Sequence, residues 1–143
     1  MRALLAIGFA LTFLTVADPA RADSTKTIYT FLQGIHWIPD TTKGVPPGSY
    51  YAVLRGKDGD KCDEMVLERF PDGFVYPWHV NHEYDLYTIL KGTLVIGFNE
   101  HHQKSAERAL PAGSFIQGLA NEPHYGRAIG ETIFEVYSPC PKV

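Results

Sequence analysis

The side chains best suited to chemistry gather in one short stretch, "YPWHVNHEYDLY", residues 76–87. Two of the six histidines of the chain lie in it, three positions apart, among amide and carboxylate side chains. Groups of these kinds at close spacing bind divalent metals, and they also occur as a plain polar patch at the start of a strand. The candidates are His79, Asn81, His82, Glu83 and Asp85.

Strand geometry sorts these candidates. In an extended chain alternate side chains share one face, so one face carries His79, Asn81, Glu83 and Asp85, and His82 points the other way. A turn or bulge between positions 81 and 85 would turn Glu83 outward and keep the other three inward. A register shift of one residue would instead exchange Asn81 for His82, and this alternative stays open.

A third histidine, His124, follows at a distance in "ANEPHYGRA", after a proline and an expected tight turn. With His79 and Asp85 it makes a set of two histidines and one carboxylate. Such a set suits divalent Fe, Mn, Ni or Zn and leaves open positions for water or substrate. Asn81 would add a weak neutral oxygen ligand.

The segments that must position these side chains are typical of β-strands. They are rich in Val, Ile, Thr and aromatic residues, and turn signals containing Gly, Pro or Asp separate them. No window after Ala22 shows the apolar period of a helix. The sequence therefore predicts an all-β domain, a sandwich or a barrel. The expected strands are 49–56, 62–70, 84–98, 113–119 and 132–138, with turns at 56–60, 71–73, 91–92, 111–113 and 130–131.

The N-terminal segment has the pattern of a secretory signal peptide. A short positive start and an apolar run that is short for a membrane span are followed by the small residues Ala20 and Ala22. We expect cleavage after Ala22, and an uncleaved anchor is the alternative. No second apolar segment of membrane length follows, which predicts a periplasmic or secreted protein without a stable membrane span.

Charge and cysteine content narrow the partners. The formal net charge is −3 and no cluster of Lys and Arg is interleaved with aromatic residues, which argues against nucleic-acid binding. In an oxidising compartment Cys62 and Cys140 are expected to form a disulfide, with two free thiols as the alternative. Their spacing does not fit a metal-binding C-x-x-C pair.

Two segments resemble the sequence motifs of the cupin superfamily. Gly73, His79, Asn81, Asp85 and Gly92 stand at the spacing of the first motif, G-x5-H-x-H-x(3,4)-E-x6-G. In this chain an asparagine replaces the second histidine and an aspartate replaces the glutamate.

The segment "GSFIQGLANEPHYGRA", residues 113–128, is similar to the second cupin motif, G-x5-P-x-G-x2-H-x3-N. Its first glycine and its histidine, His124, match. Leu119, Asn121 and Ala128 stand at the Pro, Gly and Asn positions. Asn121 is a plausible substitute for glycine because asparagine tolerates left-handed backbone conformations.

The resemblance covers about residues 45–138 and implies a cupin-like double-stranded β-helix, a jelly-roll barrel that holds one divalent metal between its sheets. Carried over by position, the ligands are His79, Asn81, Asp85 and His124. Many such domains are dimers, so a homodimer is expected. The chain then divides into a signal peptide (1–22), an N-terminal arm with the loop that leads into the barrel (23–44) and a cupin domain (45–143).

Aromatic residues beside the motif positions predict a pocket for a small organic molecule. The leading hypothesis is an exported metal-dependent oxidoreductase of the dioxygenase type, with the metal as redox centre or Lewis acid. An isomerase or lyase would use the same ligands with a different base. The alternative is a non-catalytic protein that binds or senses a small ligand, with a weak or absent metal site. The side chains expected to line the pocket are Trp78, Tyr87, Gln117 and Tyr125.

Overall fold

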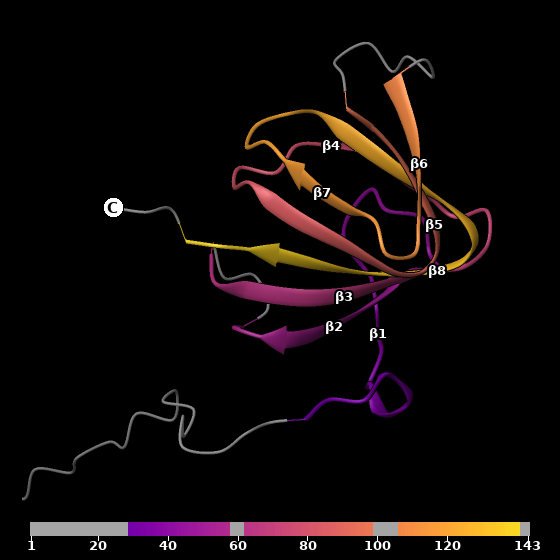
Figure 1. Cartoon of the computed structure of the whole chain (residues 1–143), viewed down its shortest axis with the longest axis vertical. Coiled ribbons are helices and arrows are strands. Elements are labelled where there is room, and N and C mark those ends of the chain that lie inside the picture. The colour runs from indigo at the N-terminus through magenta and orange to yellow at the C-terminus, as the bar shows by residue number, and fades with distance from the viewer. Residues whose placement is uncertain (1–28, 58–61, 99–105, 141–143) are drawn as a thin grey trace, which may run out of the picture.

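The computed structural model describes residues 29–57, 62–98 and 106–140. The predicted signal peptide lies outside these ranges, as do His101 and His102 in the polar loop between the two motifs. Within them strands are the main regular structure, as predicted, and the one helical element of these ranges is a short 3-10 turn, η1 (Leu32–Gly34), before the first strand (Figure 1). No helix in the described ranges is long and apolar enough to cross a membrane.

Eight antiparallel strands form the described part of the domain. All five predicted strands are present, and β1, β4 and β6 are additional. A proline inside β4 and another at the end of β6 lower the strand propensity of these segments, which explains why their sequences did not reveal them. The strands are β1 (Ile38–Pro39), β2 (Tyr50–Arg55), β3 (Glu64–Phe70), β4 (Val75–His79), β5 (Asp85–Phe98), β6 (Glu107–Pro111), β7 (Phe115–Gly118) and β8 (His124–Ser138).

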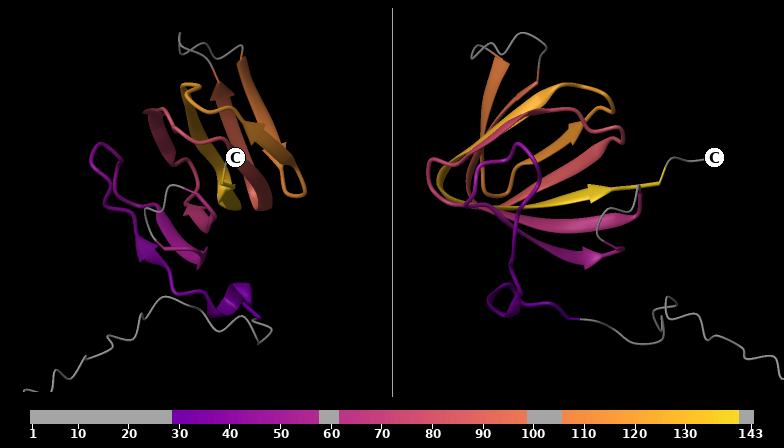
Figure 2. Two further views of the ribbon diagram at one scale, coloured as in Figure 1. Left: turned by 90° about the vertical axis from the view of Figure 1, so that its left-hand side faces the viewer. Right: turned by 180° about the vertical axis from the view of Figure 1, so that it is seen from behind.

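Two long strands, β5 and β8, pair with each other along most of their length. The first half of β5 also pairs with β7 and its second half with β6, while β8 pairs first with β4 and then with β3. These changes of partner create two sheets, in strand order β1-β2-β3-β8-β5-β7 and β4-β8-β5-β6. Figure 2 shows the strands curving round one interior. The arrangement is the predicted jelly-roll barrel.

Both long strands bend at a glycine. The turns predicted at 91–92 and 130–131 do not end the strands, because β5 and β8 continue through these positions, β5 with shifts of register. Gly92 and Gly130 have φ values of 71° and 69°, in the left-handed region that glycine enters without strain. A β-carbon at Gly92 would lie 2.4 Å from the carbonyl oxygen of Glu131, so a larger residue does not fit there.

Aromatic side chains fill the barrel beside this bend. Phe70 on β3 packs against Phe74 and Phe134, with ring centroids 4.7 Å and 5.0 Å apart. Ile89 and Leu94, on either side of the bend in β5, are almost completely buried. The polar motif residues lie at the other end of the barrel, where β4 ends and β5 and β8 begin. The core therefore closes one end and leaves the opposite end for a site.

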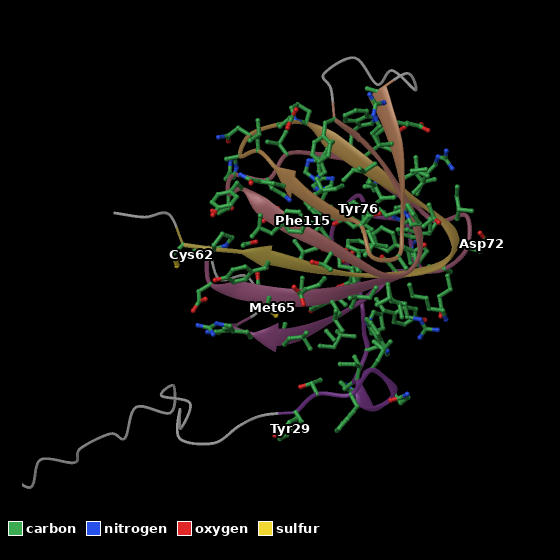
Figure 3. The ribbon with its side chains drawn as sticks, viewed as in Figure 1. Tyr29, Cys62, Met65, Asp72, Tyr76 and Phe115 are labelled. Carbon is green, nitrogen blue, oxygen red and sulfur yellow. A yellow bond between two sulfur atoms is a disulfide. The ribbon has the colours of Figure 1, made fainter. Side chains whose placement is uncertain are left out.

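The predicted disulfide joins Cys62 to Cys140. In the antiparallel pair of β3 and β8, Glu64 lies opposite Ser138, so the chain positions two residues further out also face each other. These positions are the two cysteines, and their Cα atoms are 4.6 Å apart, within the range that a disulfide spans. Figure 3 shows Cys62 beside the C-terminal end of β8.

Replacing both cysteines by serine is expected to lower the free energy of unfolding by about 4 kcal/mol, because the unfolded chain regains the entropy of a long loop. Urea unfolding of the wild type and the double variant measures the difference. Thiol titration of the unfolded, unreduced wild-type protein should find no free thiol. Two titratable thiols would contradict the bond.

Candidate functional site

Two of the predicted ligands face each other across a strand pair at the open end of the barrel. His79 at the end of β4 lies opposite His124 at the start of β8 in the strand register. The centroids of their imidazole rings are 4.2 Å apart. His124 is buried and His79 is partly buried. The pairing of β4 with β8 thus joins the histidines of the two motifs.

Backbone carbonyl groups select the tautomer of both rings. Nδ1 of His79 donates to the carbonyl oxygen of Pro77 at 2.9 Å, and Nδ1 of His124 donates to that of Glu122 at 3.0 Å. Since a carbonyl oxygen only accepts, each neutral ring carries its proton on Nδ1 and a lone pair on Nε2. Loss of hydration on burial lowers the pKa of both histidines, so both rings are neutral at neutral pH.

The two Nε2 atoms differ in their surroundings. The hydroxyl group of Tyr87 on β5 donates to Nε2 of His124 over 3.3 Å. Burial raises the pKa of Tyr87 far above its ordinary value, so this hydroxyl keeps its proton. Nε2 of His79 has no hydrogen-bond partner in the part of the chain that the structure describes. His79 therefore presents the more available lone pair.

Asp85, the predicted carboxylate ligand, is buried and already engaged. Nδ2 of Asn81 donates to one carboxylate oxygen at 2.6 Å, and Oγ of Ser138 donates to the other at 2.5 Å. The short loop after β4 brings Asn81 and Asp85 together, as strand geometry predicted. Asn81 and Asp85, which the motif would place at a metal, are therefore hydrogen-bonded to each other.

These contacts bear on the metal that the resemblance implies. A centre of two histidines and one carboxylate needs a carboxylate oxygen that is free to bind the ion. Each oxygen of Asp85 accepts one hydrogen bond and keeps a second lone pair, but no group of three or more His, Cys, Asp or Glu side chains among residues 29–57, 62–98 and 106–140 is arranged to hold a metal. His79 and His124 supply two ligands, and the residues as arranged do not fit a complete three-ligand centre.

A cavity of about 130 Å³ lies between the sheets beside the two histidines. This volume is close to the cavity of about 150 Å³ that holds benzene in an engineered protein. Five apolar side chains from both sheets form much of its wall, among them Phe70 and Phe134. Figure 3 shows Tyr76 of β4 among the side chains of the interior. The polar lining residues are Glu68, Tyr76, His79, Asn81, Tyr87 and His124.

Of the four side chains predicted to line the pocket, only Tyr87 lies at this cavity. Gln117 is exposed on β7. Trp78 and Tyr125 pack against each other, with ring centroids 4.7 Å apart, and line a separate groove. For Tyr125 the reason is alternation along β8, because His124 and Gly126 on either side of it point inward and Tyr125 must point outward. The prediction was wrong for these three residues.

The remaining polar neighbours lie outside the site. His82 is exposed, and its Nδ1 lies 3.1 Å from the amide oxygen of Asn121. The register shift that would exchange His82 for Asn81 is therefore not adopted. Asn121 has a φ of 61°, which is the left-handed conformation expected of a residue at a glycine position of the second motif.

Glu68 on β3 is a site residue that the sequence did not reveal. It lines the cavity from the sheet opposite to the one that carries His79 and His124. Loss of hydration on burial, followed by the negative charges of Asp40 and Asp85, raises its pKa to about 8. Both faces of β3 carry apolar residues, so alternation in the sequence could not show which face is inside.

A wider groove of about 370 Å³ adjoins the cavity, and Glu68 and Tyr76 line both spaces. Its walls come from β2, β3 and the chain just after β1, and they carry the carboxyl groups of Asp40 and Glu64. Neither space is lined by a lysine or an arginine of the described ranges. The resulting negative potential disfavours anions in the groove.

Solved structures identify the architecture. The polyketide cyclase RemF from Streptomyces resistomycificus matches with a TM-score of 0.66 and 15% identity, over 81% of each chain. A predicted oxalate decarboxylase from Thermotoga maritima has a TM-score of 0.61 and 18% identity, over 79% of this chain and 100% of that one. An RmlC-like cupin from Shewanella frigidimarina has a TM-score of 0.59 and 14% identity, over 82% of this chain and 95% of that one. The chain therefore has the cupin fold, as its motifs predicted.

The same similarities leave the reaction open. No protein-family model and no curated protein matches the sequence. The cyclase and the predicted decarboxylase share this fold, but their names indicate different reactions. A fold that carries several activities does not select one, so function has to be argued from the residues of the cavity.

Glu68 makes stability depend on pH with a defined sign. The pKa of its carboxyl group is about 8 in the folded protein and 4.5 ordinarily, so folding binds a proton between these values. The stabilisation that the protonated Glu68 gives the folded state is complete below about pH 4.5 and is lost as the pH rises through about 8. Between about pH 6 and about pH 8 the free energy of unfolding of the wild type should therefore fall. In Glu68→Gln this fall should be smaller by about 1 to 2 kcal/mol.

Urea unfolding at the two pH values measures this change. One titrating group can change the free energy of unfolding by at most about 1.4 kcal/mol per pH unit, and the expected change is smaller because Glu68 keeps some accessible surface. Glu135→Gln on β8, whose neighbours Phe134 and Val136 point into the cavity, is the outward-facing control. A decline in Glu68→Gln as steep as in the wild type would show that Glu68 is not the titrating group.

Proposed function

We propose that the protein is an exported cupin-fold enzyme that binds a small organic molecule in the barrel cavity and transforms it by proton transfer. The supporting observation is the pair of neutral imidazoles, His79 and His124, each with Nδ1 bonded to a backbone carbonyl and Nε2 left as the basic atom beside the cavity. A neutral imidazole within reach of a substrate is the most common general base in enzymes.

The ligand inferred from the cavity is small and carries no negative charge. The volume of about 130 Å³ accepts one ring or a molecule of similar size. Phe70 and Phe134 offer aromatic surface, and Asn81, Tyr87 and the histidines offer a few polar contacts that would orient it. The absence of lysine and arginine from the described lining argues against carboxylate or phosphate groups at this position.

In the proposed reaction His79 removes a proton from the bound molecule. Its Nε2 is the lone pair without a partner in the described ranges, while the Nε2 of His124 accepts from Tyr87. Tyr87 and His124 then contact the bound molecule without taking its proton. Isomerisation and elimination are reactions of this kind, because both begin with the loss of a proton to a base.

A second candidate is a metal-dependent enzyme, with dioxygenase-type chemistry as its first form. Histidines whose Nδ1 is bonded to a carbonyl oxygen are in the state in which Nε2 binds metals. His79 and His124 would hold the ion, and Asp85 would have to turn the remaining lone pair of a carboxylate oxygen toward it to join them. A bound metal would supply Lewis-acid or redox chemistry.

The proposal includes the cell compartment and the assembly. The N-terminal pattern supports export to the periplasm or medium, and a disulfide between Cys62 and Cys140 suits an oxidising compartment. The homodimer that the cupin resemblance implies is retained as a prediction, as is the absence of nucleic-acid partners.

Cyclohexanone and phenol, single rings of the size of the cavity, are suitable probes of the site. His79→Ala and His124→Ala are each expected to weaken their binding about tenfold, because each removes a polar contact worth about 1.4 kcal/mol. Ligand-observed NMR on the folded proteins measures the affinities. The matched control is His36→Ala, since His36 is exposed and lines neither the cavity nor the groove.

Two outcomes would contradict the proposed site. Wild-type protein that binds neither ring would rule out the cavity as a small-molecule site. Binding that is equal in the wild type, the two site variants and the control would place the ligand elsewhere.

Elemental analysis separates the two candidate functions. For the proton-transfer enzyme we expect clearly less than one equivalent of transition metal per chain in protein purified from the periplasm, because no third His, Cys, Asp or Glu side chain of the described ranges is arranged to join His79 and His124 at an ion. The content should not change in a His79→Ala/His124→Ala double variant. One full equivalent that is lost in that variant would instead support the metal-dependent enzyme.

A further inference from the structure

Glu68 has no part in the function proposed so far, yet it borders the same cavity. It extends from β3, in the sheet opposite to His79, and with Tyr76 it separates the cavity from the outer groove. No hydrogen bond or ion pair within residues 29–57, 62–98 and 106–140 engages its carboxyl group. The side chain is half-buried, and a carboxylate with so little access to water and no donor beside it would be costly, so the group is expected to keep its proton.

The surroundings of Glu68 act in the same direction. Asp40 on the groove side and Asp85 on the cavity side place negative charge near it, and Glu64 lies further along the groove. The other titratable groups that face it are Tyr76, Tyr87 and the two neutral histidines, and no lysine or arginine among the described lining residues compensates. Its pKa of about 8 agrees with a protonated carboxyl group at neutral pH.

We propose that Glu68 is the general acid of this site, and that it protonates the oxygen of a small uncharged carbonyl compound while His79 removes a proton from the adjacent carbon. This inference rests on the proton-transfer function proposed above and names its acid and its substrate class. Glu68 and His79 extend from opposite sheets, so a molecule that fills the small cavity between them meets the acid on one side and the base on the other.

The proton and electron balance of the step is complete without a further reactant. Nε2 of His79 takes the proton, and the electron pair of the broken C–H bond becomes the second bond between the two carbons. The electron pair of the carbonyl double bond moves to oxygen, which takes the proton of Glu68. The products are an enol, an imidazolium and a carboxylate, and the reverse transfer to the same or another carbon restores both residues.

The substrate class follows from what the site can and cannot stabilise. A protonated carboxyl group donates a hydrogen bond to a carbonyl oxygen and becomes stronger as a donor when charge develops there. Aromatic walls and the volume of about 130 Å³ suit a compact ketone or aldehyde. The groove beyond Glu68, which carries the carboxyl group of Asp40 and is lined by no lysine or arginine of the described ranges, disfavours a keto acid or a sugar phosphate.

Exchange of the α-protons of cyclohexanone for deuterium tests the inference directly. In D2O the wild-type protein should accelerate this exchange, as followed by proton NMR, and Glu68→Gln should slow the protein-dependent rate about a hundredfold. The amide introduced by this substitution has nearly the shape of the acid but cannot transfer a proton. Glu135→Gln, which removes an outward-facing carboxylate from the neighbouring strand, should keep the wild-type rate.

The pH profile of the exchange distinguishes an acid from a merely structural residue. In the wild type the rate should fall as the pH rises through about 8, because Glu68 then loses its proton. This decline should be absent from the residual rate of Glu68→Gln. A full rate in that variant, or a decline in it that equals the wild-type decline, would overturn the role of Glu68.

Binding of the same probe separates this inference from the function on which it depends. Cyclohexanone should bind to Glu68→Gln within about threefold of its wild-type affinity, since the amide still donates a hydrogen bond. Binding to the wild type without accelerated exchange would overturn the carbonyl chemistry and leave the binding site intact. Failure of the wild type to bind cyclohexanone or phenol would instead reject the proposed function itself.

Discussion

The pairing of β5 with β8 is the constraint on which the rest of the domain depends. Each strand takes part in both sheets, so the bends near Gly92 and Gly130 allow one pair of strands to form two walls of a barrel. A β-carbon at Gly92 would collide with the backbone at Glu131, which ties the closing glycine of the first motif to this geometry. The disulfide between the loop before β3 and the chain after β8 closes the same sheet at its other end.

The location of the site follows from that constraint. Strands that bend at one end of the barrel must begin and end at the other, and the polar residues of both motifs stand at those ends. Aromatic side chains around Phe70 occupy the space near the bend. Between the two regions remains a small cavity whose walls change from aromatic to polar. A ligand there would be positioned by packing on one side and by hydrogen bonds on the other.

Three titratable side chains of the cavity, Glu68, His79 and His124, are uncharged at neutral pH. The carboxyl group of Glu68 has a raised pKa, whereas the pKa of His79 and of His124 is lowered, and loss of hydration is the first cause in all three. Asp85 accepts hydrogen bonds from Asn81 and Ser138. A protonated acid opposite a neutral base is an arrangement suited to moving protons, whereas no group of three His, Cys, Asp or Glu side chains in the described ranges is arranged as a metal centre.

The sequence by itself determined the all-β class, the cupin-like spacing of the motifs and the choice of Cys62 and Cys140 as a candidate disulfide pair. These features depend on local rules, namely the strand propensity of β-branched and aromatic residues, glycine at bends and an even number of cysteines. Only the tertiary structure decided that Glu68 faces the cavity, that Asp85 is bound by Asn81 and Ser138, and that Trp78 and Tyr125 lie outside. Alternation defines the two faces of a strand, but which face is inside depends on strands that are distant in sequence and meet only when the barrel closes.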